Sequence, residues 1–258
     1  MIILIHSSKT MKPTTPNGIK LSEPTFIKQA KEISKYLGSL DSGQIQKTMG
    51  VSKNLASEIQ KTINGWSSAS KGAAVYTFRG DVYSGFQVAS LDKADVEYAS
   101  KHLRIISGLY GILKPLDGIA PYRLEMGYKL PSAKYNNLYA FWADNLSKTL
   151  PKESITINLT SSEYGKAIIP YIDKSTVISP RFLTYNKATK SNSTVAVHSK
   201  IARGAYANWL IKNRVDKTDE LKKFNELGYE YNAKLSSESE PTYVCEEFGG
   251  KGLSVRLK

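Results

Sequence analysis

Short apolar runs and amphipathic segments alternate along the whole chain. The apolar run at 2–5 predicts a buried strand that delivers the polar residues 6–10 to a sheet edge. The spacing of Phe26, Ala30, Ile33 and Leu37 predicts an amphipathic helix that ends near Gly38. Further strands are predicted over 73–78, 155–159, 176–185 and 193–198. Further helices are predicted over 92–101, with Asp92 as the cap, and over 201–213. The end of the chain is expected to form short strands around Tyr229, Tyr231, Tyr243, Val244 and Val255.

These elements interleave without a regular strand–helix rhythm. We therefore expect a mixed α/β (α+β) fold, a single compact body around a mixed β-sheet. No internal repeat or long linker interrupts the pattern, so residues 1–258 are expected to form one domain.

Two short helices joined by a glycine are predicted at about 42–66. Ile45 and Met49 lie on one face of the first helix, Gly50 permits a tight turn, and Ser52 can cap a second helix. The pattern resembles a helix-hairpin-helix, in which backbone N–H groups at the second helix contact phosphates. The DNA-binding residues expected here are Lys47, Gly50, Ser52, Lys53 and Lys61. An ordinary helical hairpin packed on the body is the alternative.

Composition describes a globular protein with a full core. The chain has 258 residues, of which 41% are hydrophobic and 23% charged. No apolar run is long enough to span a bilayer, and the first residues lack the features of a signal peptide, so a cytoplasmic protein without membrane contact is expected. Cys245 is the single cysteine, and His6, His102 and His198 lie far apart, so neither a metal site nor a cofactor is expected. Oxygen ligands from Asp81, Glu125 or Glu163 are the alternative for a metal.

The formal net charge of +13 is concentrated in two segments. Between 9 and 71, ten lysines face four acidic residues, and between 181 and 223, ten basic residues face three acidic ones. The rest of the chain is balanced. Concentrated positive charge favours a polyanion such as nucleic acid or a nucleotide, and a lysine-rich soluble surface is the alternative.

Residues 102–127 place charge inside apolar sequence. Arg104 stands among Leu103, Ile105 and Ile106, and Arg123 and Glu125 flank Leu124. Charged groups that are buried need partners, and such groups gather at functional sites. An arginine–carboxylate pair that braces loops is the alternative.

Two predicted strand exits carry acids, tyrosines and bases together. They are 78–85, FRGDVYSG, and 157–166, INLTSSEYGK, and they resemble the rim of one pocket. If the charged groups converge there, they can hold a phosphate and leave a carboxylate for acid–base chemistry. The pocket candidates are Lys9, Thr10, Arg79, Asp81, Tyr83, Arg104, Tyr110, Arg123, Glu125, Glu163, Tyr164, Lys166, Lys200 and Arg203. The alternative to a ligand pocket is that these charged groups pair with one another and hold the loops closed.

Five motifs together resemble the bacterial YaaA family of peroxide stress proteins. They are the two strand exits, the segment 102–127, LYAFW at 138–142 and KIARG at 200–204, in order and in register. Of the family's first motif, Ser-Pro-Ala-Lys-Thr, only Lys9 and Thr10 match, because His6, Ser7 and Ser8 occupy the first three positions.

The resemblance implies a mixed α/β body with a positively charged cleft and a helix-hairpin-helix that binds duplex DNA with little sequence preference. It also implies a role in limiting oxidative damage linked to intracellular iron. The family hairpin maps onto 44–63. The competing hypothesis is an enzyme, or a nucleotide- or nucleobase-binding protein, that uses the charged pocket at the strand ends.

Overall fold

The central sheet brings together strands from distant parts of the chain. The computed structural model describes residues 1–254, and its five-stranded sheet has the order β6-β5-β1-β8-β9. The strands are β1 (Ile2–His6), β5 (Leu103–Ser107), β6 (Gly111–Leu113), β8 (Thr156–Asn158) and β9 (Val177–Ile178). β1 runs parallel to β5 and β8, whereas β6 is antiparallel to β5, so the predicted mixed sheet is confirmed. β1 is fully buried over Ile2–Ile5 because both faces of the sheet are covered.

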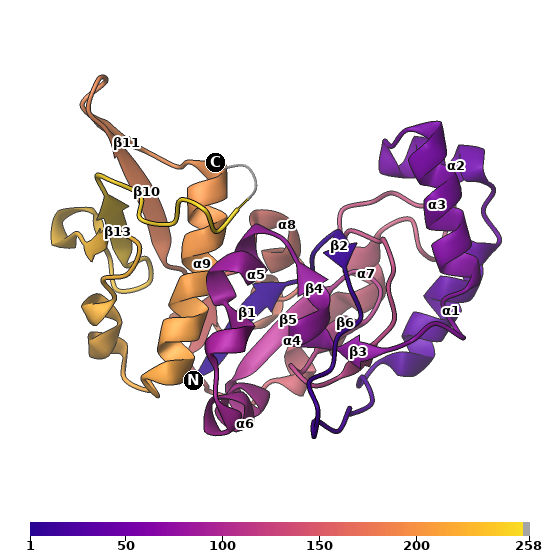
Figure 1. The fold of residues 1–258 in the computed structure, drawn as a ribbon, viewed down its shortest axis with the longest axis horizontal. Helices are drawn as coiled ribbons and strands as arrows, with labels where there is room; N and C mark the ends of the chain where they lie inside the picture. The colour runs from indigo at the N-terminus through magenta and orange to yellow at the C-terminus, as the bar shows by residue number, and fades with distance from the viewer. Residues whose placement is uncertain (255–258) are drawn as a thin grey trace.

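A second sheet lies at one end of the molecule, and the central sheet lies in the middle (Figure 1). It has the order β11-β10-β13-β12. Its strands are β10 (Arg181–Asn186), β11 (Ser191–Ser193), β12 (Tyr229–Tyr231) and β13 (Thr242–Cys245). Two further strand pairs are β2 (Thr10–Met11) with β4 (Phe78–Arg79) and β3 (Gly72–Ala73) with β7 (Gly118–Ile119).

Nine α-helices surround these sheets in the described part of the chain. They are α1 (Ile27–Gly38), α2 (Ser42–Met49), α3 (Lys53–Asn64), α4 (Ala74–Thr77), α5 (Asp81–Phe86), α6 (Lys93–His102), α7 (Leu138–Trp142), α8 (Ser162–Gly165) and α9 (Ala196–Lys212). Short 3₁₀ turns cover Val88–Ser90, Ala143–Asn145, Ser147–Thr149, Ile169–Tyr171, Lys174–Thr176, Thr218–Lys223 and Ala233–Leu235. No helix within residues 1–254 is long and apolar enough to cross a membrane.

Helix α9 lies between the two sheets and crosses α5 at two glycines (Figure 1). A side chain at Gly204 would collide with the carbonyl oxygen of Val82, and one at Gly85 with that of Ile201. The two backbones therefore touch, which only glycine allows. The Asn208 side chain fixes the crossing by donating a 2.6 Å hydrogen bond to the carbonyl of Phe86. Buried side chains from the central sheet, the second sheet and the helices belong to one connected core.

Most predicted elements are confirmed, and two strands are wrong. The predicted strand at 73–78 is mainly the helical turn α4, whose amides at Ala74 and Val75 donate to the carbonyls of Asp117 and Pro115. A short apolar run does not distinguish a buried strand from a buried helical turn.

The predicted strand at 193–198 instead ends β11 and begins α9. Residue Val197 favours strands locally, but α9 packs along its whole length, and tertiary packing overrides weak local preference. The predicted strand 176–185 is divided into β9 and β10 at Ser179-Pro180. Val255 lies outside the described residues.

Candidate functional site

The carboxyl ends of β1, β5 and β8 meet at one edge of the central sheet. These strands are parallel neighbours, and they end at His6, Ser107 and Asn158. In open sheets that contain parallel strands, ligands bind outside these carboxyl ends. The side chains gathered there are named the strand-end cluster: His6, Ser7, Lys9, Tyr83, Tyr122, Arg123, Glu125, Glu163, Tyr164, Lys200 and Arg203.

His6 is held as a neutral hydrogen-bond acceptor. The backbone N–H of Ser161 donates to its Nδ1 over 3.3 Å, and the ring stacks on Tyr164 with centroids 4.9 Å apart. Burial, together with the positive charges of Arg203 and Lys200, lowers the pKa of His6 to about 3. The imidazole is therefore uncharged at neutral pH, and Tyr83 fixes the same residue by donating 3.0 Å to its carbonyl.

Buried hydroxyl groups link β1 to β5. The Ser7 hydroxyl donates a 3.2 Å hydrogen bond to Tyr164 Oη, and Tyr122 Oη shares a 2.6 Å hydrogen bond with Ser107 Oγ. Ser7 also lies near enough to Tyr122 to affect its pKa, so the two hydroxyl pairs are neighbours. Burial raises the pKa of both Tyr122 and Tyr164 above the ordinary tyrosine value, so both phenols keep their protons.

Two carboxylates lie near these hydroxyl groups. Glu125 Oε2 is 3.8 Å from Lys9 Nζ, and Tyr164 lies within hydrogen-bonding reach of the same carboxylate. The Glu163 Oε1 atom accepts a 2.8 Å hydrogen bond from the Gly127 N–H. Burial raises the pKa of Glu125, and the neighbouring negative charge of Glu163 raises it further, against the attraction of Lys9. A carboxyl group in this environment can hold or accept a proton.

The strand-end cluster contains eight of the fourteen pocket candidates. They are Lys9, Tyr83, Arg123, Glu125, Glu163, Tyr164, Lys200 and Arg203. Sequence reasoning did not select His6, Ser7 and Tyr122 for this pocket. The signal that could have found His6 and Ser7 is their place directly after the apolar strand 2–5, because a parallel strand delivers its last residues to the ligand-binding edge.

The other six candidates make their contacts elsewhere or point into solvent. Arg79 donates to the carbonyls of Tyr76 and Phe78 and to Thr14, and Arg104 donates to the carbonyls of Ser100 and Leu103 at the end of α6. Both arginines therefore brace the backbone. The Tyr110 hydroxyl accepts from the Ala120 N–H in the core, and Asp81 accepts from Ser254. Thr10 is exposed on β2, and Lys166 is exposed beside α8.

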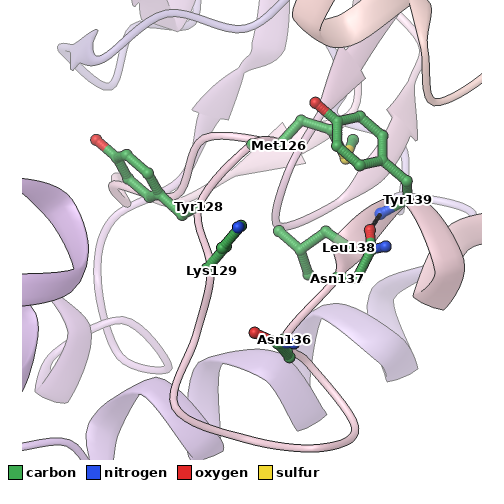
Figure 2. Close-up of a pocket in the computed structure, with 8 residues that line it drawn as sticks. Met126, Tyr128, Lys129, Asn136, Asn137, Leu138 and Tyr139 are labelled. Atoms are coloured by element: carbon green, nitrogen blue, oxygen red, sulfur yellow. Dashed lines mark hydrogen bonds between the residues drawn. The ribbon is translucent and has the colours of Figure 1, made fainter.

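Two hollows flank the carboxylates. The first has a volume of about 220 Å³ and is lined by Met126, Gly127, Tyr128, Lys129 and residues 136–139. Figure 2 shows Lys129 directed into the space near Leu138, Tyr139 on the opposite side of that space, and Tyr128 turned away from it. The second hollow, about 180 Å³, lies between α3 and the body and is lined by Lys9, Met11, Leu55, Glu58, Ile59, Thr62, Pro121, Tyr122 and Arg123.

The predicted pair of helices at 42–66 forms as α2 and α3, named here the helical hairpin (Figure 1). Gly50 ends α2 with φ +60°, and no atom lies within 4 Å of the place where its side chain would start. Ser52 caps α3 by accepting from the Leu55 N–H over 3.4 Å. Whether this hairpin is a DNA-binding helix-hairpin-helix remains a prediction.

The DNA-binding candidates share one property, which is exposure to solvent. Lys47, Gly50, Ser52, Lys53 and Lys61 are all exposed. The apolar faces of both helices are buried through Ile45, Met49, Ala56, Ile59 and Ile63. The helical hairpin therefore presents its glycine turn and lysines outward while its apolar side packs on the molecule.

Within residues 1–254, no three His, Cys, Asp or Glu side chains lie close enough together to hold a metal ion. Cys245 is buried in the second sheet and 3.5 Å from the Thr184 hydroxyl. The strand-end cluster is thus a set of hydroxyl, carboxylate and basic groups.

Comparison with known proteins identifies the family to which this chain belongs. Residues 1–235 match the family model described as peroxide stress protein YaaA. A UPF0246 protein of Salinispora tropica is 44% identical over 99% of this chain and 98% of its own. UPF0246 proteins of Roseobacter denitrificans and of a Ruegeria species are each 36% identical over 95% of this chain and 98% and 99% of their own. The chain therefore belongs to the family of the peroxide stress protein YaaA, and this membership supports a role in peroxide stress.

Proposed function

We propose that the protein binds duplex DNA with little sequence preference through the helical hairpin, and that this binding limits oxidative damage linked to intracellular iron. The observation that carries the proposal is the open glycine turn in front of α3. Gly50 adopts a left-handed conformation with free space beside it, so a phosphate can approach the backbone closely. The first N–H groups of α3 lack acceptors within the helix and attract anions.

The lysines around this turn add electrostatic attraction. Lys47 lies in the last turn of α2, Lys53 begins α3, and Lys61 lies in the last turn of α3. The side chains of all three are exposed, and none of them forms an ion pair among residues 1–254. Contacts of this type bind phosphates without distinguishing base sequence.

The second hollow adds two basic side chains between the helical hairpin and the body. It is lined by Leu55, Glu58 and Ile59 of α3 on one side and by Lys9 and Arg123 on the other. Arg123 is half-buried at this hollow, and a guanidinium can bind a phosphate through two parallel hydrogen bonds.

Fluorescence anisotropy with a labelled duplex tests this proposal. The test variant is Lys47→Ala/Lys53→Ala/Lys61→Ala, and its matched control is Lys93→Ala/Lys101→Ala/Lys152→Ala, which removes three exposed lysines outside the helical hairpin. We expect the test variant to lose affinity on the order of 100-fold at about 0.1 M salt, since each phosphate contact contributes through counterion release. Equal losses in the two variants would show that only total charge matters and would reject the helical hairpin as the binding surface.

The strand-end cluster favours a second candidate function, acid–base chemistry on a nucleotide or nucleobase. The negative charge of Glu163 raises the pKa of Glu125, and the buried Tyr164 phenol, which accepts from Ser7, lies near Glu125. Phosphate binding at the helical hairpin does not require such a group of carboxylates. Mass spectrometry of nucleosides and DNA incubated with wild-type protein and with Glu125→Gln tests it. A product that depends on Glu125 supports this function, and identical spectra reject it.

A further inference from the structure

We propose that the first hollow, lined by residues 126–129 and 136–139, is a nucleobase-binding pocket. This proposal deepens the proposed function, because it states which part of a nucleic acid or nucleotide the body receives while phosphates contact the helical hairpin. The volume of about 220 Å³ is room for roughly seven water molecules at about 30 Å³ each. That space fits one base or nucleoside and is smaller than the usual pocket for a drug-sized ligand.

The walls of this pocket have the chemistry that bases require. The aromatic ring of Tyr139 lies beside the hollow, and Met126 and Leu138 supply apolar surface, whereas the ring of Tyr128 is directed away from the space (Figure 2). Aromatic rings stack on any base because every base has a π-face. The pocket is therefore suited to a flat heterocycle.

Polar groups at the pocket can bond the edge of a base. The Asn137 side-chain oxygen is occupied, because it accepts from the N–H groups of Tyr139 and Ala140 at the start of α7. Its amide NH₂ group remains available as a donor. Asn136 is exposed at the rim and offers both an amide donor and an acceptor, and Lys129 offers a positive charge. Side-chain amides are the groups that bond base edges with paired donor and acceptor contacts.

The pocket is joined directly to the strand-end cluster. Gly127 lines the pocket, and its N–H donates to Glu163. A side chain at Gly127 would begin 3.1 Å from Glu163 Oε1, so the carboxylate lies immediately behind the pocket wall. The negative charge of Glu163 also acts on Tyr139. A base bound here lies beside the carboxylates of the strand-end cluster.

The pocket and the helical hairpin share one connecting segment. Residues 121–123 line the hollow under α3, and residues 126–129 line the nucleobase pocket, so only Leu124 and Glu125 separate the two linings. A nucleic acid held at the helical hairpin can therefore present a base to this pocket after the base leaves its stack. Enzymes that act on a base of a duplex expose it in this way. A free nucleotide offers the same base chemistry.

Two readouts test the pocket and separate these two sources of the base. The first is the fluorescence of a duplex that contains one 2-aminopurine, at saturating full-length protein. The second is direct titration with adenosine, guanosine, cytidine and thymidine. The variants are Tyr139→Ala and Asn136→Ala, and the matched control is Tyr171→Ala, a tyrosine that is 44% exposed and does not line the pocket. Duplex affinity is measured for each protein by anisotropy.

If the pocket receives a base from the duplex, both the wild-type protein and the Tyr171→Ala variant increase the 2-aminopurine fluorescence several-fold. Tyr139→Ala and Asn136→Ala lose this increase and keep their duplex affinity. If the pocket instead binds a free nucleotide, the 2-aminopurine fluorescence of the duplex does not change and at least one nucleoside binds. Tyr139→Ala then weakens nucleoside binding roughly 10-fold through lost stacking. Nucleoside binding without duplex binding would reject the helical-hairpin function and keep the pocket. No fluorescence increase together with no nucleoside binding overturns the pocket.

Discussion

The helical hairpin and the strand-end cluster are both rich in charge, but they are built in opposite ways. The helical hairpin is a continuous segment whose turn and caps come from Asp41, Gly50 and Ser52, within a few residues of the helices that they end or begin. The strand-end cluster joins residues as distant as His6 and Arg203, and its groups contact one another. Exposed, unpaired lysines suit a partner that supplies the counter-charge. Paired and desolvated groups suit a small ligand whose protons must be controlled.

A pair of glycine substitutions compares the helical hairpin with the crossing of α5 and α9, the helices that carry Tyr83 and Arg203 of the strand-end cluster, and should give the largest effect. Gly204→Ala is expected to lower the free energy of unfolding by roughly 3 kcal/mol, because its methyl group collides with the backbone of α5. Gly50→Ala is expected to cost only about 1 kcal/mol, since its φ of +60° is unfavourable for alanine but the space beside it is empty. Urea unfolding of both variants measures the difference. Equal costs would contradict the backbone contact at Gly204.

The pH dependence of stability probes the desolvated interior of the strand-end cluster. The pKa of His6 is lowered to about 3 in the folded protein, so between that value and the unfolded value near 6.5 the unfolded chain binds more protons. Stability therefore falls as pH decreases from about 6.5 to 5, with a slope approaching about 1.4 kcal/mol per pH unit.

The control for this prediction is His6→Gln, which lacks the titrating group. The lowered pKa of His198 acts in the same direction, and the raised pKa of Glu125 acts in the opposite direction, and both remain in this variant. Urea unfolding at several pH values should give a smaller slope for His6→Gln than for the wild type. The same slope in both proteins would show that His6 is not desolvated.

The Lys9–Glu125 pair should have the smallest effect on stability. Lys9 is 54% exposed, and its nitrogen is 3.8 Å from Glu125, a geometry in which ion pairs contribute little. Lys9→Met is expected to change the free energy of unfolding by less than about 1 kcal/mol. A loss above about 2 kcal/mol in thermal or urea unfolding would instead make Lys9 a structural residue and remove it from the proposed phosphate surface.

The contrast between the regions also explains how much could be predicted from sequence. The helical hairpin was predictable because its signals, the glycine, the Ser52 cap and the apolar spacing of Ile45 and Met49, act over one or two helical turns. The central strand and helices α1, α6 and α9 were predictable for the same reason.

The composition of the strand-end cluster was only partly predictable. Tyr83, Glu125 and Glu163 were expected on the rim of one pocket, but Arg79 and Arg104 were included with them although both brace local backbone. Which charged residue turns toward a shared edge depends on strand order and on packing far away in the chain. His6 directly follows the apolar strand 2–5, but its contacts also depend on the neighbouring strands β5 and β8, and it was not selected.

The most direct test of the account is the salt dependence of duplex binding by the wild type, the Lys47→Ala/Lys53→Ala/Lys61→Ala variant and its three-lysine control. Anisotropy titrations between about 50 and 200 mM salt give the slope of log affinity against log salt. We predict a steep wild-type slope that is retained in the control and reduced by about 2.7 in the hairpin variant, at about 0.9 per lost phosphate contact. Wild-type affinity that does not change with salt, or equal slopes in all three proteins, would contradict DNA binding by the helical hairpin.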